Sequence, residues 1–172
     1  IVLLLASVLA ACSSSPPDGL SAVEEFDINR YTGRWYEIAR LDHRFERGLS
    51  NVTAEYTQQD NNNVSVLNRG YDEEEQRWDE AEGSAKFVGE TDRGSLKVSF
   101  FGPFYGGYHI IALDQANYQW AMISGPSRDY LWILAREPVL APEIYQDLTQ
   151  QARNSGFATD ELIEVDQQRH LP

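Results

Sequence analysis

The strongest constraint on the fold is a succession of short segments, between residues 35 and 136, in which apolar and polar side chains alternate. In residues 52–57, for example, Val52, Ala54 and Tyr56 alternate with polar residues. A period of two residues is typical of β-strands with one face in the core and one in water. Clusters of Gly, Pro, Asn and Asp divide the stretch into segments near residues 35–41, 51–58, 63–70, 77–89, 94–101, 107–113, 118–124 and 129–136. Eight strands with hairpin-length turns predict an all-β fold, an antiparallel up-and-down β-barrel.

An amphipathic α-helix is expected after the strands. Pro142 suits a first helical turn, and Gly156 can end the helix. The apolar stripe of this helix recurs at four-residue spacing and consists of Ile144, Leu148 and Ala152. Residues 130–135 are apolar on both faces, so we expect the helix to pack on the outside of this last strand. Ile163 and Val165 are candidates for a short extra strand.

The first eleven residues are almost wholly apolar and uncharged, but a helix that spans a bilayer needs roughly 20 residues. We expect residues 1–11 to be the hydrophobic part of a signal peptide whose start is missing. The segment ends at Leu9-Ala10-Ala11-Cys12, which resembles a bacterial lipobox, and Cys12 is the one cysteine of the chain. We therefore expect Cys12 to become a lipid-bearing N-terminus, and residues 12–25 to be a flexible tether. An ordinary cleaved signal with an incidental cysteine is the alternative.

Charge and cysteine content exclude several classes of protein. The chain has 27 acidic residues against 14 lysines and arginines, and its net charge of −13 argues against nucleic-acid binding, which needs a positive surface. A single cysteine forbids an intramolecular disulfide and a zinc site built on several thiolates. With this negative charge, any electrostatic attraction of the protein to anionic membranes is weak. We therefore expect the tether, and not electrostatics, to hold the protein near lipid.

Three motifs, in this order along the chain, resemble the signature of the lipocalins. They are Gly33-Arg34-Trp35, then Asp129-Tyr130, and then Arg136 at the end of the last expected strand. In lipocalins the tryptophan seals the closed end of the barrel, and the arginine lies across its indole. The resemblance therefore assigns Trp35 and Arg136 to the stability of the fold, through a cation–π contact and hydrogen bonds of the guanidinium.

Four longer stretches of this chain resemble the bacterial lipocalins that are outer-membrane lipoproteins related to apolipoprotein D. These stretches are residues 35–40, 42–48, 97–108 and 128–134. The similarity places the barrel and its helix at residues 26–172. The disulfide cysteines of the animal relatives are missing, so closure of the barrel must depend on packing. The resemblance implies an outer-membrane protein anchored through Cys12, with its domain facing the periplasm of a Gram-negative bacterium. Ser13 after the cysteine resembles the sorting signal for that membrane.

The resemblance also implies binding of fatty acids or lysophospholipids, for lipid storage or transport in envelope maintenance. An eight-stranded barrel has room for one small ligand. Alternation anchored on inward-facing Trp35 and Arg136 turns Glu37 and Ala112 inward as well. It predicts a cavity with few charges, lined by Ala39, Ala54, Tyr56, Val66, Asn68, Phe87, Val98, Phe100, Tyr108, Ile110, Trp132 and Leu134. For any one of these residues, filling of the core is as good an interpretation as contact with a ligand.

The loop at residues 42–49 offers a polar rim for such a ligand. Arg44 and Arg47 flank Phe45, and we expect the three to lie near a carboxylate or phosphate head group at the open end. A solvated hairpin without ligand contacts is the alternative. No cofactor is expected, and a homodimer through the barrel mouth is left open.

The sequence contains no catalytic motif and no pair of histidines at a metal-ligand spacing. His43, His109 and His170 are scattered, and alternation turns His109 outward. We therefore predict a binding protein and not an enzyme. A lipocalin-fold enzyme or a haem carrier is the alternative, and it needs an inward-facing nucleophile or histidine. A membrane-spanning barrel is a second alternative, but its apolar residues would have to face outward.

Overall fold

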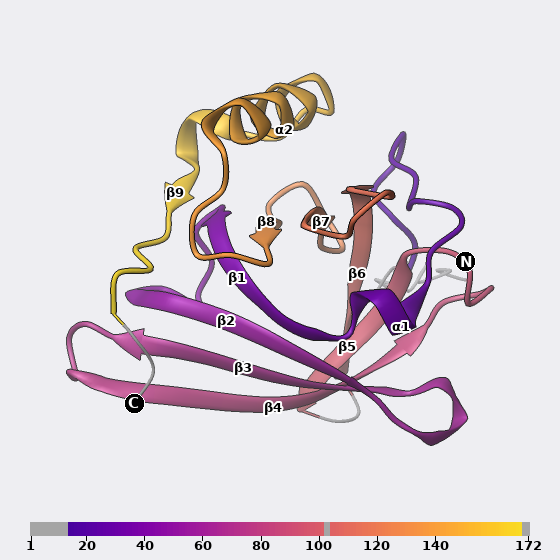
Figure 1. The fold of residues 1–172 in the computed structure, drawn as a ribbon, viewed down its shortest axis with the longest axis horizontal. Coiled ribbons are helices and arrows are strands. Elements are labelled where there is room, and N and C mark those ends of the chain that lie inside the picture. Colours follow the sequence, from indigo (N-terminus) through magenta and orange to yellow (C-terminus); the bar gives the residue numbers. More distant parts are fainter. Residues whose placement is uncertain (1–13, 102–103, 170–172) are drawn as a thin grey trace, which may run out of the picture.

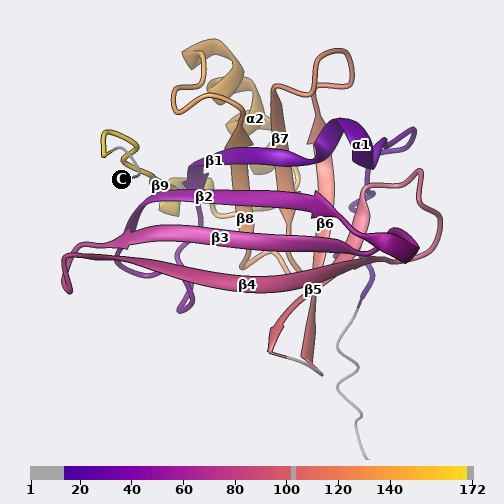
Figure 2. The same ribbon diagram turned by 60° about the horizontal axis from the view of Figure 1, so that its bottom comes forward.

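The structure, a computed structural model, describes residues 14–101 and 104–169. Eight antiparallel strands follow one another around a closed barrel, because both β2 and β8 pair with β1. They are β1 (Gly33–Arg40), β2 (Leu49–Gln58), β3 (Val64–Asp72), β4 (Arg77–Phe87), β5 (Ser95–Phe101), β6 (Phe104–Leu113), β7 (Trp120–Ser124) and β8 (Leu131–Ala135) (Figure 1). In Figure 2, β1–β4 cross steeply in front of β6–β8. The predicted up-and-down barrel is confirmed.

The helix predicted after the strands is α2 (Pro142–Asn154), which lies outside the barrel and away from β2–β4 (Figure 1). Pro142 occupies its first turn, and Gly156 adopts a φ of +87° just beyond its end. Leu148 and Ala152 are buried in one cluster with Leu131 of β8. The prediction that the helix covers the outside of the last strand is confirmed.

Shorter elements complete the chain. They are α1 (Ile28–Tyr31), two 3-10 turns, η1 (Asp60–Asn62) and η2 (Thr159–Glu161), and β9 (Ile163–Glu164). The short strand β9 pairs with the end of β1, where Ala39 faces Glu164, so the extra strand is confirmed. Over the described ranges, no helix is both long and apolar enough to cross a membrane.

Two separate apolar clusters stabilise the fold. One lies inside the barrel, and its buried members include Trp35, Ile110 and Leu134. The other lies between the barrel and α2, and includes Met122 and Ile133. Burial of these faces removes apolar surface from water at about 25 cal/mol per Å². The apolar faces of most strands therefore point into the barrel, as their alternation predicts.

Bulges reverse the alternation at two places. The ladder between β1 and β8 shifts between Glu37 and Ala39, and the ladder between β6 and β7 shifts between Ile110 and Ala112. A bulge adds one unpaired residue, so the side chains beyond it change face. Ala39 and Ala112 consequently belong to the cluster beneath α2. The prediction that Ala39 lines the cavity is wrong, and so is the inward assignment of Ala112.

The closed end of the barrel is built around Trp35, which is fully buried. The Arg136 guanidinium lies 3.9 Å from the centre of a Trp35 ring and donates hydrogen bonds to the carbonyls of Arg30, Arg34 and Tyr118. The Trp35 indole N–H donates to the Tyr31 carbonyl at 2.8 Å. Arg136 thereby joins the segment before β1 to the chain after β8 without a disulfide.

The described part of the expected tether contacts the barrel. The Val23 amide donates to the Ile110 carbonyl of β6, and the Phe26 amide donates to the Asp92 carbonyl. Arg128 donates to the Asp18 carbonyl at 2.8 Å. A freely moving linker would therefore have to precede these contacts. The expected signal segment at residues 1–11 and the expected lipidation site at Cys12 lie outside the described residues.

Candidate functional site

The predicted lining residues divide into a buried floor and a half-exposed wall. Tyr56, Val66, Ile110 and Leu134 are buried, and Phe87 packs at the closed end with its ring centre 6.2 Å from that of Phe26. The members of the wall are Ala54, Asn68, Val98, Phe100, Tyr108 and Trp132. All but Asn68 pack against the cluster inside the barrel, so their remaining exposure is toward its interior. The half-exposed wall, rather than the buried floor, is therefore the part of the predicted lining that a ligand could touch.

Three tyrosine hydroxyls meet at the floor. The Tyr108 hydroxyl lies 2.6 Å from that of Tyr31 and 2.9 Å from that of Tyr56. Burial is the main cause that raises the pKa of all three phenols, and the neighbouring phenols raise that of Tyr108 further. The three groups are therefore neutral at physiological pH and form a polar but uncharged floor.

Alkaline titration should distinguish these phenols from exposed ones. Because the folded state holds their protons more tightly, the free energy of unfolding should fall as the pH rises above the ordinary phenol pKa of about 10. Tyrosinate absorbance measures ionisation, and circular dichroism measures unfolding. At least these three phenols are expected to ionise only at the pH at which the protein unfolds. In Tyr56→Phe this late step should lose the amplitude of one phenol. A late step of unchanged size would contradict the assignment.

Asn68 provides a polar group on the otherwise apolar wall. It lies opposite Ala54 of β2 and Ala81 of β4 in the ladder, so it shares their inward face. Its Oδ1 is buried and has no hydrogen-bond partner among the described residues. A buried acceptor without a donor costs about 1–3 kcal/mol. A ligand hydroxyl or amine at this position would remove that cost.

A buried charged network lies at the mouth of the barrel. Alternation correctly turned Glu37 inward, but it did not indicate the partners of this carboxylate. Arg40 donates to Glu37 Oε1 at 2.9 Å and to the carbonyls of Glu46 and Leu49. Its inward position is a consequence of the same bulge that turns Ala39 outward, so strict alternation could not predict it. The charge pattern near residues 37–46 was the only available signal. The network folds the loop after β1 over the mouth.

The two carboxylates of this network have pKa values shifted in opposite directions. Burial, followed by repulsion from the Glu46 carboxylate, raises the pKa of Glu37 well above its usual range, and Arg40 offsets this only in part. For Glu46, burial alone would raise the pKa, but hydrogen bonding and charge from His43, with help from Trp132, lower it. His43 Nε2 lies 2.7 Å from Glu46 Oε2, and the Trp132 indole N–H donates to the same oxygen at 3.0 Å. Glu46 thus fixes the orientation of Trp132 at the mouth.

The predicted rim residues lie in the loop that this network holds. Phe45 is 59% exposed, and the Arg44 guanidinium lies 4.8 Å from the centre of its ring. Arg47 is already paired with Asp42, to which its Nε donates at 2.9 Å. Arg44 forms no ion pair with any residue that the structure describes, so of the two arginines its charge is the one that a ligand could meet.

Of the two described histidines, His43 pairs with Glu46 at the mouth and His109 lies in the barrel wall. His109 faces outward, as predicted, and its Nδ1 lies 2.7 Å from Ser95 Oγ in a buried pair. Burial lowers the pKa of His109, and a backbone hydrogen bond at Ser15 offsets part of this shift. Within residues 14–101 and 104–169, no group of three or more His, Cys, Asp or Glu side chains could hold a metal ion. The pair is sealed from a ligand in the barrel.

Comparisons with known proteins give relatives along nearly the whole chain. Residues 26–167 match the family of lipocalin-like domains. The outer membrane lipoprotein Blc of Vibrio cholerae serotype O1 is 50% identical over 168 residues, which cover 98% of this chain and 98% of the relative. The protein of the same name from Escherichia coli K12 is 50% identical over 163 residues, which cover 94% and 92%. Apolipoprotein D of Mus musculus is 31% identical and covers 92% of this chain and 84% of its own length.

Solved structures share the fold at lower sequence identity. Insecticyanin from the tobacco hornworm Manduca sexta superposes with a TM-score of 0.70 at 20% identity, covering 88% of this chain and 86% of its own. The cockroach allergen Per a 4 superposes with a TM-score of 0.68 at 19% identity, covering 90% and 96%. The barrel with its outer helix, the Trp35–Arg136 pair and the family match agree, and the chain belongs to the lipocalin family.

Proposed function

We propose that the chain is a membrane-anchored binding protein that holds one fatty acid or lysophospholipid in its barrel. The observation that carries this proposal is the wall of inward-facing but half-exposed apolar residues above a buried floor, exemplified by Val98, Phe100 and Trp132. Burial of about ten CH₂ groups contributes roughly 8 kcal/mol gross, at about 0.8 kcal/mol each. Immobilisation and ordering cost several kcal/mol, so the expected Kd is micromolar.

The polar end of such a ligand must stay hydrated or paired, because an unpaired buried charge is costly. Asn68 Oδ1 is an acceptor for a glycerol hydroxyl in the wall. Arg44 is the cation of the rim and lies beside Phe45, whereas Arg47 is paired with Asp42. A fatty-acid carboxylate at the mouth would therefore meet Arg44.

The proposed location is the outer membrane of a Gram-negative bacterium, with the barrel in the periplasm and a lipid on Cys12. The lipobox-like sequence before Cys12 and the full-length relatives named outer membrane lipoprotein Blc support this location. The proposed role is storage or transport of lipids during envelope maintenance. Two or three acyl chains on one residue would make the anchor nearly irreversible.

Replacement of the lipidated residue tests the anchor and the ligand together. The wild-type protein is expected in the membrane fraction and to remain there in high salt, because its net charge of −13 gives no electrostatic attachment. Cys12→Ser should appear in the soluble periplasmic fraction. Native mass spectrometry of this soluble form should show one acyl lipid per chain. Membrane retention of Cys12→Ser would contradict the anchor, and a ligand-free or cofactor-loaded chain would contradict the lipid-binding function.

A further inference from the structure

The two lysines of the chain form a cross-strand pair on the outer wall of the barrel. Lys86 and Lys97 are the only lysines in the sequence, and the ladder between β4 and β5 places them directly opposite each other. Like charges in this arrangement destabilise a sheet. Within the described part of the chain, neither lysine forms an ion pair. Their ammonium groups lie 5.7 and 5.2 Å from the centre of the Tyr105 ring.

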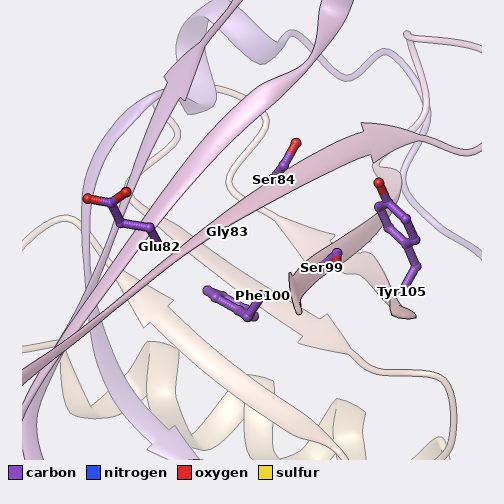
Figure 3. Close-up of a pocket in the computed structure, with 6 residues that line it drawn as sticks. All are labelled: Glu82, Gly83, Ser84, Ser99, Phe100 and Tyr105. Carbon is purple, nitrogen blue, oxygen red and sulfur yellow. The ribbon is translucent and has the colours of Figure 1, made fainter. Parts of the chain in front are cut away.

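A pocket of about 320 Å³ lies beside this lysine pair. Its lining residues, shown in Figure 3, are Glu82, Gly83, Ser84, Ser99, Phe100 and Tyr105. Ser84 and Ser99 are the next cross-strand pair, two residues along from the lysines on the same outer face. Ser99 is 8% exposed, and its hydroxyl has no partner among the described residues. Ammonium groups and a hydroxyl without a partner are the donors that a phosphate group accepts from.

The two strands that form the barrel wall at this pocket are only partly paired. The pairing of β4 with β5 ends at Ser84 and Ser99, and residues 77–83 of β4 pair with β3 alone. A Cβ on Gly83 would lie 2.8 Å from the Phe100 ring, so the ring packs directly against the backbone of β4. Of the lining residues, Phe100 alone also packs against the cluster inside the barrel. In Figure 3 its ring and Ser84 lie on opposite sides of the strand that carries Gly83.

We propose that this pocket and the lysine pair bind the phosphate of a lysophospholipid whose acyl chain occupies the barrel. The head group then leaves the barrel through the side wall between β4 and β5, and the Phe100 ring moves to admit the glycerol segment. The proposal rests on the lipid-binding function proposed above and names the ligand class. Glu82 lines the same pocket, and its carboxylate suits the ammonium of a zwitterionic head group such as phosphoethanolamine.

The test compares two lipids of equal acyl-chain length, a lysophosphatidylethanolamine and an uncharged monoacylglycerol, on the wild type and a double variant. Lys86→Gln/Lys97→Gln is expected to weaken lysophosphatidylethanolamine binding by about tenfold or more. Monoacylglycerol binding should not change. The free energy of unfolding should not fall, because the substitution removes a repulsion between like charges.

A matched control removes the same charge from two exposed positions outside both the pocket and the rim. Arg77→Gln/Arg93→Gln should leave the affinity for lysophosphatidylethanolamine within about a factor of two. An excess of free glycerophosphoethanolamine should compete only weakly, because it lacks the acyl chain. Strong competition by that compound would instead assign the pocket to a free phosphate ester and overturn the proposal.

Each remaining outcome has one meaning. If the lysine variant binds both lipids as tightly as the wild type does, or loses both equally, the side-wall site is wrong and the barrel function stands. If the arginine control alone loses affinity for lysophosphatidylethanolamine, the phosphate lies elsewhere on the surface and the side-wall site is wrong. If the wild type binds neither lipid, the proposed function itself fails.

Discussion

Trp35→Ala is expected to lower the free energy of unfolding by about 3–5 kcal/mol, the usual range for truncation of a buried tryptophan or phenylalanine. Trp35 is 0% exposed, and the ring of Tyr31 lies with its centre 4.8 Å away. The substitution removes the hydrogen bond to the Tyr31 carbonyl and the surface on which Arg136 lies. Small domains have only about 5–15 kcal/mol in total, so the loss is a large fraction of the stability.

Urea denaturation followed by circular dichroism measures this loss. Trp78→Ala is the matched control, because it also removes an indole but from a half-buried position. The centres of the Trp78 and Tyr71 rings lie 5.5 Å apart. That control should lose about 1 kcal/mol. Arg136→Lys keeps the charge but not the planar fork that reaches three carbonyls, and should lose about 1–3 kcal/mol. If Trp35→Ala lost no more stability than Trp78→Ala, the assignment of Trp35 to closure of the barrel would be wrong.

Ala54→Trp is expected to block the barrel to long acyl chains. Ala54 lies on β2 between Trp35 of β1 and Asn68 of β3, with its small side chain on the half-exposed inner wall. An indole there would displace about three to five CH₂ groups, or roughly 2–4 kcal/mol at about 0.8 kcal/mol each. That energy corresponds to a factor of about 30 to 1000 in Kd.

A graded series makes the Ala54 experiment specific. Ala54→Leu, Ala54→Phe and Ala54→Trp should weaken binding in that order, and the loss should be larger for longer acyl chains. Thr57→Trp adds the same indole to the exposed outer face of β2 and should leave the affinity unchanged. Urea denaturation checks that the variants fold, since overpacking can cost about 1–3 kcal/mol. Unchanged affinity in folded Ala54→Trp would place the acyl chain elsewhere.

Much of the fold was predictable because its determinants are local or belong to a family signature. The period of two residues, together with the turn residues between segments, located the eight barrel strands, and Pro142 and Gly156 located both ends of the helix. Trp35 and Arg136 lie far apart in the sequence, and only the resemblance to lipocalins predicted that they meet. Their 3.9 Å contact follows from closure of the barrel, which brings β8 beside β1.

The site was less predictable, because it depends on interruptions of the regular pattern. One bulge in β1 turned Ala39 out of the barrel and Arg40 into a buried network, and no residue type in that segment indicates a bulge. The pairing of Lys86 with Lys97 depends on the register of two strands joined by a long turn. Division of the lining into floor and wall depends on side-chain packing, which alternation alone does not describe.

The most direct test of acyl-chain binding in the barrel is a titration of the delipidated protein with a lysophospholipid, followed by tryptophan fluorescence. Trp132 reports on the mouth, because it is half-exposed on the inner wall and its indole donates to Glu46, whereas Trp35 is sealed at the closed end. We predict a saturable, one-site change at micromolar ligand that is absent in Trp132→Phe. A folded, delipidated protein that responds to neither lysophospholipids nor fatty acids would contradict acyl-chain binding in the barrel.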